Sequence, residues 1–185
     1  LFLINKRLSI IGLKNGNQPI LSKKKDIVFI ANGEIYNFIE IKKYLKSKNI
    51  TFETNTDVEV ILKLYEYKGI KGFSLLRGMY SFCLYDQKKK LVYIFRDRVG
   101  EKPLYYKIEK NLILFNSEFR SLIGSLDLSF DIDCNAVNDY LFYGYIVEPK
   151  TLVKGICKLE AGNYIKIDLK NKKIKKINYW NLKSI

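Results

Sequence analysis

Asn32, Gly33 and Glu34 are the residues of this sequence whose types and spacing best suit chemistry. They follow an apolar run at 27–31, where a strand should end, and put an amide, an unhindered backbone N–H and a carboxylate within three residues. The Asn32 amide and the Gly33 N–H could stabilise a developing oxyanion, and Glu34 could bind an ammonium group. Asn-Gly after an apolar run is also the strongest short hairpin signal, and on these residues alone an ordinary turn is the commoner meaning.

Asp57 and Arg7 are two further charged residues that could bind the ends of an amino acid. The capping box Thr56-x-x-Glu59 would place Asp57 in the first helical turn, where the helix dipole keeps a carboxylate ionised. Arg7 precedes a predicted strand at 8–11, and its guanidinium could bind a carboxylate through two N–H groups. The ordinary alternatives are a carboxylate that only stabilises the helix and an arginine that is only a surface charge on an edge strand.

The absence of histidine restricts the catalytic chemistry. It excludes Ser-His-Asp and Cys-His catalysis and histidine zinc sites, and it leaves nucleophiles activated by an amine, a lysine or a metal. The three cysteines, Cys83, Cys134 and Cys157, show neither CxxC nor zinc-finger spacing. We interpret them as structural thiols rather than as the nucleophile, and their unpaired, unpatterned occurrence favours a reducing, cytoplasmic setting.

Length and composition predict a single domain across residues 1–185. Of its residues 48% are hydrophobic, enough for a sizeable core, and no apolar run approaches the length that spans a membrane. The net charge of +14 comes mainly from lysines spread along the chain, and this distribution argues against nucleic-acid binding. Since the only methionine is Met79, we expect the chain to be an N-terminally truncated part of a longer reading frame.

The elements that would position these residues follow from hydrophobic periodicity and turn signals. Helices are expected at 38–47, 56–69 and 133–142. Strands are expected at 8–11, 27–31, 50–54, 79–85, 91–96, 104–108, 112–116, 164–168 and 176–179. Strands in hairpins with inserted helices indicate an α+β domain in which helices cover antiparallel sheets.

Nine short segments make the chain resemble the glutaminase domain of glutamine-hydrolysing asparagine synthetases, from about Lys6 to Trp180. In order, the segments are NKRLSIIGL, NGNQPI, IANGEIYNF, FETNTDVEVILKLYEYKG, LLRGMYSFCLYD, IFRDRVGEKPLYY, FNSEFRSLI, LFYGYIVEPKTLVKGICKLEAGNYI and YW. The resemblance implies the four-layer αββα sandwich of the N-terminal nucleophile hydrolases. It also implies that residues 178–185 begin a linker to a synthetase domain.

The resemblance assigns roles to individual residues. Asn32 and Gly33 would form the oxyanion hole for the attacked glutamine amide. Glu34 and Asp57 would bind the α-ammonium group of glutamine, and Arg7 would bind its α-carboxylate. The backbone of two neighbouring residues would line the same pocket: Leu8 and Ile10.

The family's nucleophile is an N-terminal cysteine, which this chain lacks. Leu1 opens the sequence, and Asn5 stands where the family normally has a histidine. The resemblance therefore implies a domain that is inactive alone. In the parent protein it would hydrolyse L-glutamine and pass ammonia to the synthetase domain, which amidates aspartate. No cofactor is expected in this chain, because ATP and magnesium belong to the synthetase domain, whose Ser-Gly-Gly-x-Asp-Ser loop is absent.

Three alternatives stay open. One is a non-catalytic glutamine-binding or regulatory module, and a second is an inactive fragment that docks on a partner, because loss of a strand exposes sheet edges. The third is an amidotransferase that acts on another carboxylate, such as one on a surface sugar. The sequence leaves a homodimer of the parent protein open.

Overall fold

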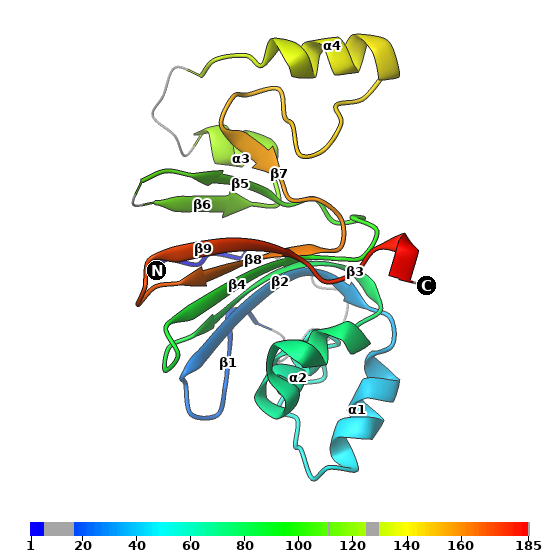
Figure 1. Ribbon diagram of the computed structural model, residues 1–185. Coiled ribbons are helices and arrows are strands. Elements are labelled where there is room, and N and C mark those ends of the chain that lie inside the picture. Colours follow the sequence, from blue (N-terminus) through cyan, green and yellow to red (C-terminus); the bar gives the residue numbers. More distant parts are fainter. Residues whose placement is uncertain (6–16, 111, 125–129, 185) are drawn as a thin grey trace.

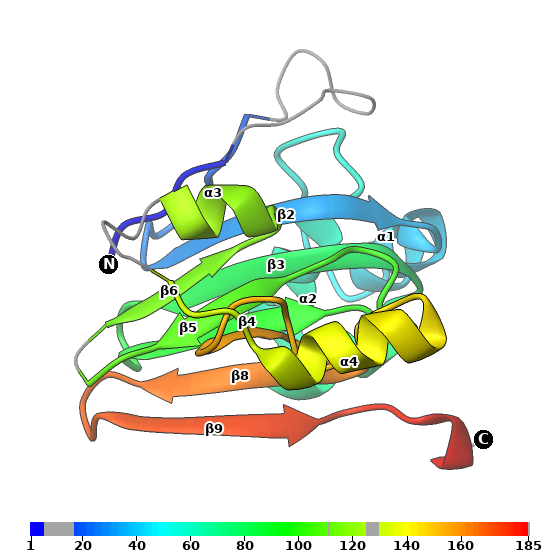
Figure 2. The ribbon, with the colours of Figure 1, turned by 90° about the horizontal axis from the view of Figure 1, so that it is seen from above.

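The computed structural model describes residues 1–5, 17–110, 112–124 and 130–184, and these form four layers (Figure 1). Helices α1 (Phe38–Lys46) and α2 (Glu59–Lys68) cover one face of a six-stranded sheet. A three-stranded sheet packs on the other face of this large sheet and carries α3 (Phe119–Gly124) and α4 (Cys134–Tyr143) on its outer side (Figures 1 and 2). The predicted four-layer αββα sandwich is therefore confirmed.

All strand pairs in the two sheets are antiparallel, as expected. The large sheet has the order β1-β2-β3-β4-β8-β9, and the small sheet has the order β6-β5-β7. The strands are β1 (Ile20–Leu21), β2 (Ile27–Ile35), β3 (Gly78–Asp86), β4 (Leu91–Arg96), β5 (Tyr105–Ile108), β6 (Ile113–Asn116), β7 (Ile156–Lys158), β8 (Asn163–Asp168) and β9 (Lys173–Asn178). Two 3-10 helices complete the described chain: η1 (Gly69–Leu75) and η2 (Leu182–Ser184).

Alternation along β2 explains how the sheet separates two cores. Phe29, Ala31 and Ile35 belong to the core beneath α1 and α2, whereas Ile30 belongs to the core between the two sheets. Because successive side chains of a strand point to opposite faces, Asn32 faces the small sheet. The alternation along β2 thus directs the Asn32 side chain into the space between the two sheets.

The hairpin alternative at Asn32-Gly33 is wrong, and so is the expected end of the strand at residue 31. Strand β2 continues through both residues to Ile35, with Asn32 opposite Ser81 and Gly33 opposite Tyr80 in β3. The chain turns only after β2 has ended. Glycine is needed at position 33 for close packing instead of for a turn: its φ is +136°, and an added Cβ would lie 2.0 Å from the Met79 carbonyl oxygen.

The predicted capping box at Thr56 and Glu59 is also wrong. Helix α2 begins at Glu59, and the Glu59 carboxylate accepts hydrogen bonds from the backbone N–H groups of Glu53 and Thr54 and from the Thr54 hydroxyl, at 2.7–2.8 Å. These bonds hold residues 53–54 as an irregular loop, so the strand expected at 50–54 does not form. The predicted end of the helix at Gly69 is confirmed.

The remaining predicted elements agree with the structure to within a few residues at their ends. The helices expected at 38–47 and 133–142 correspond to α1 and α4, and the strands expected between 79 and 116 correspond to β3, β4, β5 and β6. The strands expected at 164–168 and 176–179 overlap β8 and β9. The strand expected at 8–11 lies outside the described residues.

Candidate functional site

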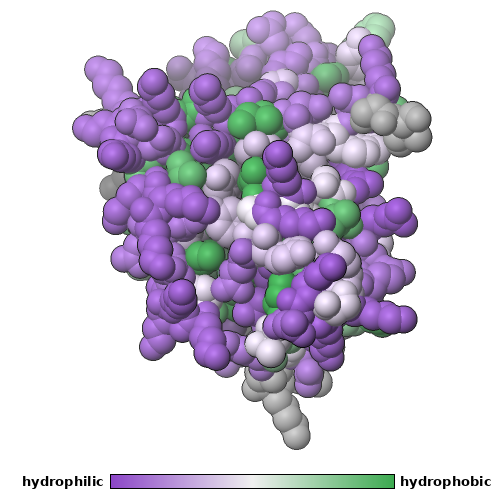
Figure 3. All heavy atoms as spheres, turned by 60° about the horizontal axis from the view of Figure 1, so that its bottom comes forward, coloured by the Kyte–Doolittle hydropathy of each residue, from purple (hydrophilic) through white to green (hydrophobic). Residues whose placement is uncertain are grey.

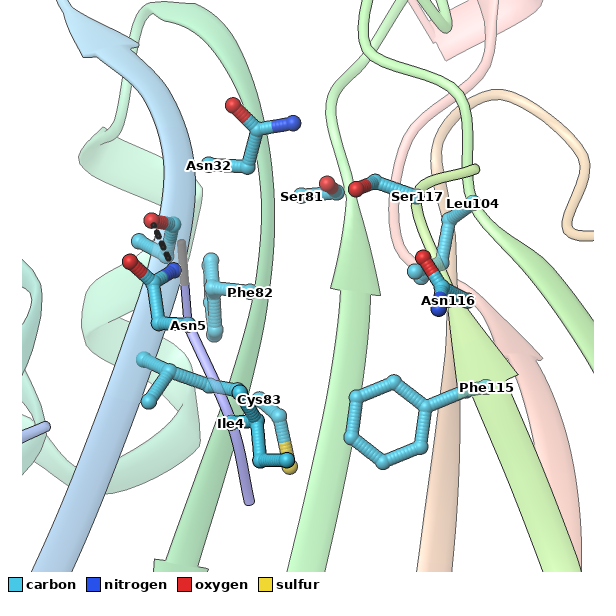
Figure 4. Close-up of a pocket in the computed structure, with 12 residues that line it drawn as sticks. Ile4, Asn5, Asn32, Ser81, Phe82, Cys83, Leu104, Phe115, Asn116 and Ser117 are labelled. Atoms are coloured by element: carbon cyan, nitrogen blue, oxygen red, sulfur yellow. Dashed lines mark hydrogen bonds between the residues drawn. The ribbon is translucent and has the colours of Figure 1, made fainter. Parts of the chain in front are cut away.

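A small pocket of about 100 Å³ lies between the two sheets, with polar side chains from both of them around it (Figure 4). Asn32 comes from β2, Ser81 from β3 directly opposite it, and Asn116 and Ser117 from the end of β6. In Figure 4 the side chains of Asn32, Ser81 and Ser117 point toward one another. The pocket therefore gathers hydrogen-bonding groups from three strands that are distant in sequence.

Apart from Asn5, the remaining side chains of this pocket are apolar or, at Cys83, a thiol. Ile30, Cys83, Leu104 and Phe115 line it. Cys83 is buried, and desolvation raises the pKa of its thiol well above the usual value. Since the thiolate is the nucleophilic form, this shift keeps Cys83 unreactive and agrees with its interpretation as a structural residue.

On either side of Gly33, the backbone of β2 forms hydrogen bonds with side chains along the edge that faces away from β3. Upstream, Ala31 donates its N–H to Gln18 Oε1 at 2.5 Å, and its carbonyl accepts from Gln18 Nε2 at 2.9 Å and from Asn5 Nδ2 at 3.2 Å. Downstream, Ile35 donates its N–H to Asp57 Oδ2 at 2.8 Å.

Among the described residues β1 pairs with β2 only at Val28 and Phe29. Because backbone groups of a strand point alternately toward and away from a neighbouring strand, the Gly33 N–H points outward, as those of Ala31 and Ile35 do. Within the described part of the chain, no acceptor lies on that N–H. An N–H that points outward beside the Asn32 side chain is the arrangement that an oxyanion hole requires.

Asp57 does not lie in the first turn of α2, so that expectation is wrong. It precedes the first helical residue, Glu59, by two positions, and it is buried at 4% exposure. Its contact with Ile35 nevertheless brings it to the strand that carries Asn32 and Glu34. Glu34 is half-buried and lies next to Ile35 in that strand. The structure thus brings the two predicted carboxylates to the same end of β2.

Three of the predicted binding residues cannot be placed, because they lie outside the described residues: Arg7, Leu8 and Ile10. Asn5, which precedes them, contacts β2 and lines the pocket, so the chain enters this segment at the site.

Asp97 organises the loop that follows β4, and its role was not foreseen. The carboxylate is fully buried, with Oδ1 accepting the N–H groups of Val99, Gly100 and Glu101 and Oδ2 accepting those of Lys102 and Tyr80. The contact with Tyr80 joins this loop to the residue next to Ser81. An acid followed by a glycine- and proline-containing loop is the only sequence signal for this arrangement.

Arg96 is the buried cation at the end of β4. It pairs with Glu148 at 2.9 Å, outside the loop that follows β4. Its guanidinium also donates to the carbonyls of Gly100, Lys102 and Leu159. Arg96 therefore ties the loop after β4 to the segment between α4 and β7.

Two larger surface depressions, of about 520 and 460 Å³, lie away from Asn32. The larger is bordered by lysines and acids of the β1–β2 turn and α2, several of them already paired, as in Lys88–Asp26 at 2.8 Å.

No described helix is long and apolar enough to cross a bilayer. The described ranges also hold no group of three or more side chains arranged to bind a metal ion.

The fold is that of the glutamine amidotransferases of the N-terminal nucleophile hydrolase type. A glutamine phosphoribosylpyrophosphate amidotransferase from Bacillus subtilis superposes with a TM-score of 0.59 over 88% of this chain and 32% of its own, at 18% identity. The sequence profile of the glutamine amidotransferase domain matches residues 1–180, and the chain belongs to this family.

Its sequence relatives include glutamine-hydrolysing asparagine synthetases. Asparagine synthetase 1 of Bacillus subtilis is 37% identical over 88% of this chain and 26% of its own length. Asparagine synthetase 2 of the same organism is 38% identical over 97% of this chain and 24% of its own length. The chain thus spans about a quarter of the length of these relatives.

Proposed function

We propose that this amidotransferase domain belongs to a longer asparagine synthetase, in which it hydrolyses L-glutamine to glutamate and ammonia. The ammonia would serve the ATP-dependent amidation of aspartate, a step that belongs to the part of the relatives outside this chain. The observation that carries the proposal is the end of β2, where the Asn32 amide, the outward Gly33 N–H, Glu34 and Asp57 lie together. We place the protein in the cytoplasm.

The chemistry of glutamine hydrolysis fits this end of β2. Attack on the side-chain amide puts negative charge on its oxygen, which the Asn32 amide and the Gly33 N–H would stabilise. The carboxylates of Glu34 and Asp57 would bind the α-ammonium group, and the Arg7 guanidinium would bind the α-carboxylate. The backbone around Leu8 and Ile10 would complete the pocket.

The nucleophile would be an N-terminal cysteine of the longer protein. Among the described residues, the thiol beside the pocket is Cys83, and its raised pKa makes it a poor nucleophile. The thiolate would form a thioester with the glutamyl group and release ammonia, and water would then release glutamate. In this proposal residues 1–185 form one truncated domain, and residues 178–185 begin the linker to the synthetase domain.

The unreactive thiol also supports a second candidate function, a glutamine-binding module without catalysis. Such a module would retain the ammonium-binding carboxylates and the oxyanion donors but would turn over no glutamine. Measured ammonia release from the full-length protein distinguishes the two candidates.

Replacing Asp57 with asparagine tests its binding role separately from its structural one. Asparagine keeps an oxygen that can accept the Ile35 N–H but removes the charge. In the full-length protein we expect Asp57→Asn to raise the Michaelis constant for glutamine about tenfold, since a charge-assisted contact contributes about 1.5–3 kcal/mol. Synthesis driven by added ammonia should stay near wild type.

Asp57→Ala is the matched control, because it removes both the charge and the hydrogen bond to β2. It should lower stability as well as glutamine affinity. If Asp57→Asn left the Michaelis constant unchanged while Asp57→Ala unfolded the protein, Asp57 would serve the fold alone.

A further inference from the structure

The smaller surface depression, of about 460 Å³, collects two of the five arginines of the chain. It is lined by α1, the end of α2, η1 and the loops before β3 and after β4. Its cations are Lys68, Arg77 and Arg98, and Glu40 is the one acid among the described residues that line it. Three cations and one acid give the lining a net charge of +2. We call this surface the arginine depression.

Arg98 is held in place by two contacts that leave most of its donors unused. Its Nη2 donates to the Ser74 carbonyl at 2.7 Å, and its guanidinium lies over the Trp180 ring, 6.0 Å from the centroid. Its Nε is buried and has no hydrogen-bond partner among the described residues. A guanidinium carries five N–H donors in a fork that fits a carboxylate or a phosphate. Arg98 is therefore oriented and retains donors for an oxyanion.

Arg77 and Lys68 complete the positive lining. Arg77 is exposed, and its backbone N–H is fixed by Asn37, whose Oδ1 accepts it at 2.9 Å. Lys68 Nζ lies 5.0 Å from the centroid of the Tyr44 ring, and a hydrogen bond to Tyr44 raises the pKa of Lys68 above its usual value. Within the described part of the chain, neither arginine of the depression pairs with a carboxylate. The three charges therefore remain available to an anion.

The larger depression differs, because its charges already neutralise one another. Three of its five lysines pair with its three acids at 2.8–3.1 Å: Lys63–Glu66, Lys88–Asp26 and Lys89–Asp86. It also contains no arginine, so it lacks the planar fork that binds oxyanions through two N–H groups. An anion should therefore prefer the arginine depression.

The surroundings of the arginine depression suit a small charged ligand. Helix α1, which lines it, belongs to a face on which hydrophilic side chains dominate and apolar surface occurs only in small separate areas (Figure 3). Docking surfaces for proteins usually present a contiguous apolar patch, which this face does not show. A volume of about 460 Å³ lies within the usual range of small-molecule sites.

The arginine depression and the proposed glutamine site lie on different sides of the end of β2. Ile35 donates its N–H to Asp57, away from β3. Tyr36, the next residue, donates its N–H to the Arg77 carbonyl at 2.8 Å, in the segment that leads into β3. No described residue of the glutamine site lines the depression. A ligand bound there would therefore leave the space assigned to glutamine free.

We propose that the arginine depression binds the phosphate group of a small phosphorylated molecule. Arg77 and Arg98 would donate to the phosphate oxygens, and Lys68 would add a third positive charge. The net charge of +2 matches a phosphate dianion better than a single carboxylate. The body of the molecule would contact the apolar and aromatic side chains of the lining: Ile41, Tyr44 and Leu75. This site goes beyond the proposed glutaminase activity and does not depend on it.

Titration followed by nuclear magnetic resonance tests the site in the chain of residues 1–185, which excludes the ATP-dependent part of the relatives. Adenosine monophosphate and inorganic phosphate should each shift the Arg98 Nε–H signal and the amide signals of residues 74–77 saturably. Amide signals of residues 23–26, at the larger depression, should not move. Absence of any shift with both probes at up to about 10 mM would overturn the proposal. Equal binding of adenosine, which has no phosphate, would also overturn it.

The two phosphate probes distinguish the sources of the phosphate group. Binding of adenosine monophosphate at least about tenfold tighter than that of inorganic phosphate would support an organic phosphate as the ligand. Equal binding of the two would identify free phosphate as the ligand and would refute the contacts assigned to the apolar side chains.

Substitution of the two arginines tests the contacts one at a time. Arg77→Gln and Arg98→Gln each remove a charge-assisted contact, so each should weaken binding of adenosine monophosphate at least about tenfold. Arg120→Gln is the matched control, because Arg120 is exposed in α3, on the outer side of the small sheet and away from α1 (Figure 1). It lowers the net charge equally and should change the affinity by no more than about twofold.

The three variants separate a built site from general attraction to a chain of net charge +14. Equal weakening in all three would show general attraction and overturn the proposal. Arg77 is exposed, so Arg77→Gln should fold like the wild type and decides the test if loss of the Ser74 contact unfolds Arg98→Gln. A folded Arg77→Gln variant that binds adenosine monophosphate as tightly as the wild type would contradict the site.

Discussion

Replacing Asn32 with alanine in the full-length protein should lower the turnover rate of glutamine hydrolysis about a hundredfold, the usual effect of losing one oxyanion donor. The Michaelis constant should change little, because the Asn32 amide would pair best with the charged oxygen that exists only during attack. Asn32 is exposed and its side chain points into the open pocket, so its removal should not disturb the packing of β2. Steady-state kinetics with glutamine would measure both constants.

Glu34→Gln is the matched control for this prediction. It removes a negative charge two residues further along the same strand. The Glu34 carboxylate would contact the α-ammonium group as soon as glutamine binds, before any attack on the amide. It should therefore raise the Michaelis constant more than it lowers turnover. Parallel losses of turnover and of ammonia-driven synthesis in both variants would mean that these residues only support β2.

Arg96→Ala should destabilise the chain by about 3–5 kcal/mol, because it leaves a partner charge and several buried acceptors without their donor. Arg96 is 1% exposed, and its guanidinium joins Glu148 to three backbone carbonyls. Denaturant unfolding of the chain of residues 1–185 would give the difference in free energy of unfolding.

Arg120→Ala provides the comparison for Arg96→Ala. Arg120 is an exposed arginine in α3, and its replacement should change the free energy of unfolding by no more than about 0.5 kcal/mol. Equal effects of the two substitutions would show that the Arg96 network contributes little to stability.

The sequence predicted the parts of the fold that local periodicity controls. The apolar runs of β3 and β4, bounded by turn signals, and the amphipathic pattern of α1 placed these elements within a residue or two of their observed ends. The layer order was not available from periodicity, because the same hairpins and helices could pack in several ways. It came from the family resemblance.

The errors arose where hydrogen-bond partners outside the recognised motif decided the local structure. Asn32-Gly33 has the composition of a turn, but pairing with β3 extends the strand through it. Thr56 and Glu59 have the spacing of a capping box, but the Glu59 carboxylate is already used by residues 53–54. Pairing with β3 thus outweighed turn propensity at Asn32-Gly33, and hydrogen bonds to the preceding loop outweighed capping propensity at Glu59.

The candidate site was predicted in its residue types more fully than in its geometry. Asn32, Glu34 and Asp57 were singled out, and the structure brings them to one end of β2. Ser81 was not foreseen as a neighbour of Asn32 because the β2–β3 register sets that contact, and Asn116 was not foreseen because only the stacking of the two sheets brings β6 to the pocket. The five N–H contacts of Asp97 were missed for a similar reason, since no spacing rule signals them.

Ammonia release from L-glutamine by the full-length protein and by the chain of residues 1–185 tests the central claim most directly. The account predicts that the full-length protein forms ammonia and glutamate in equal amounts, whereas the shorter chain releases no ammonia above background. No release by the full-length protein would contradict it. So would activity of the shorter chain that disappears when Cys83, Cys134 or Cys157 is replaced, because the nucleophile would then be one of the thiols that we regard as structural.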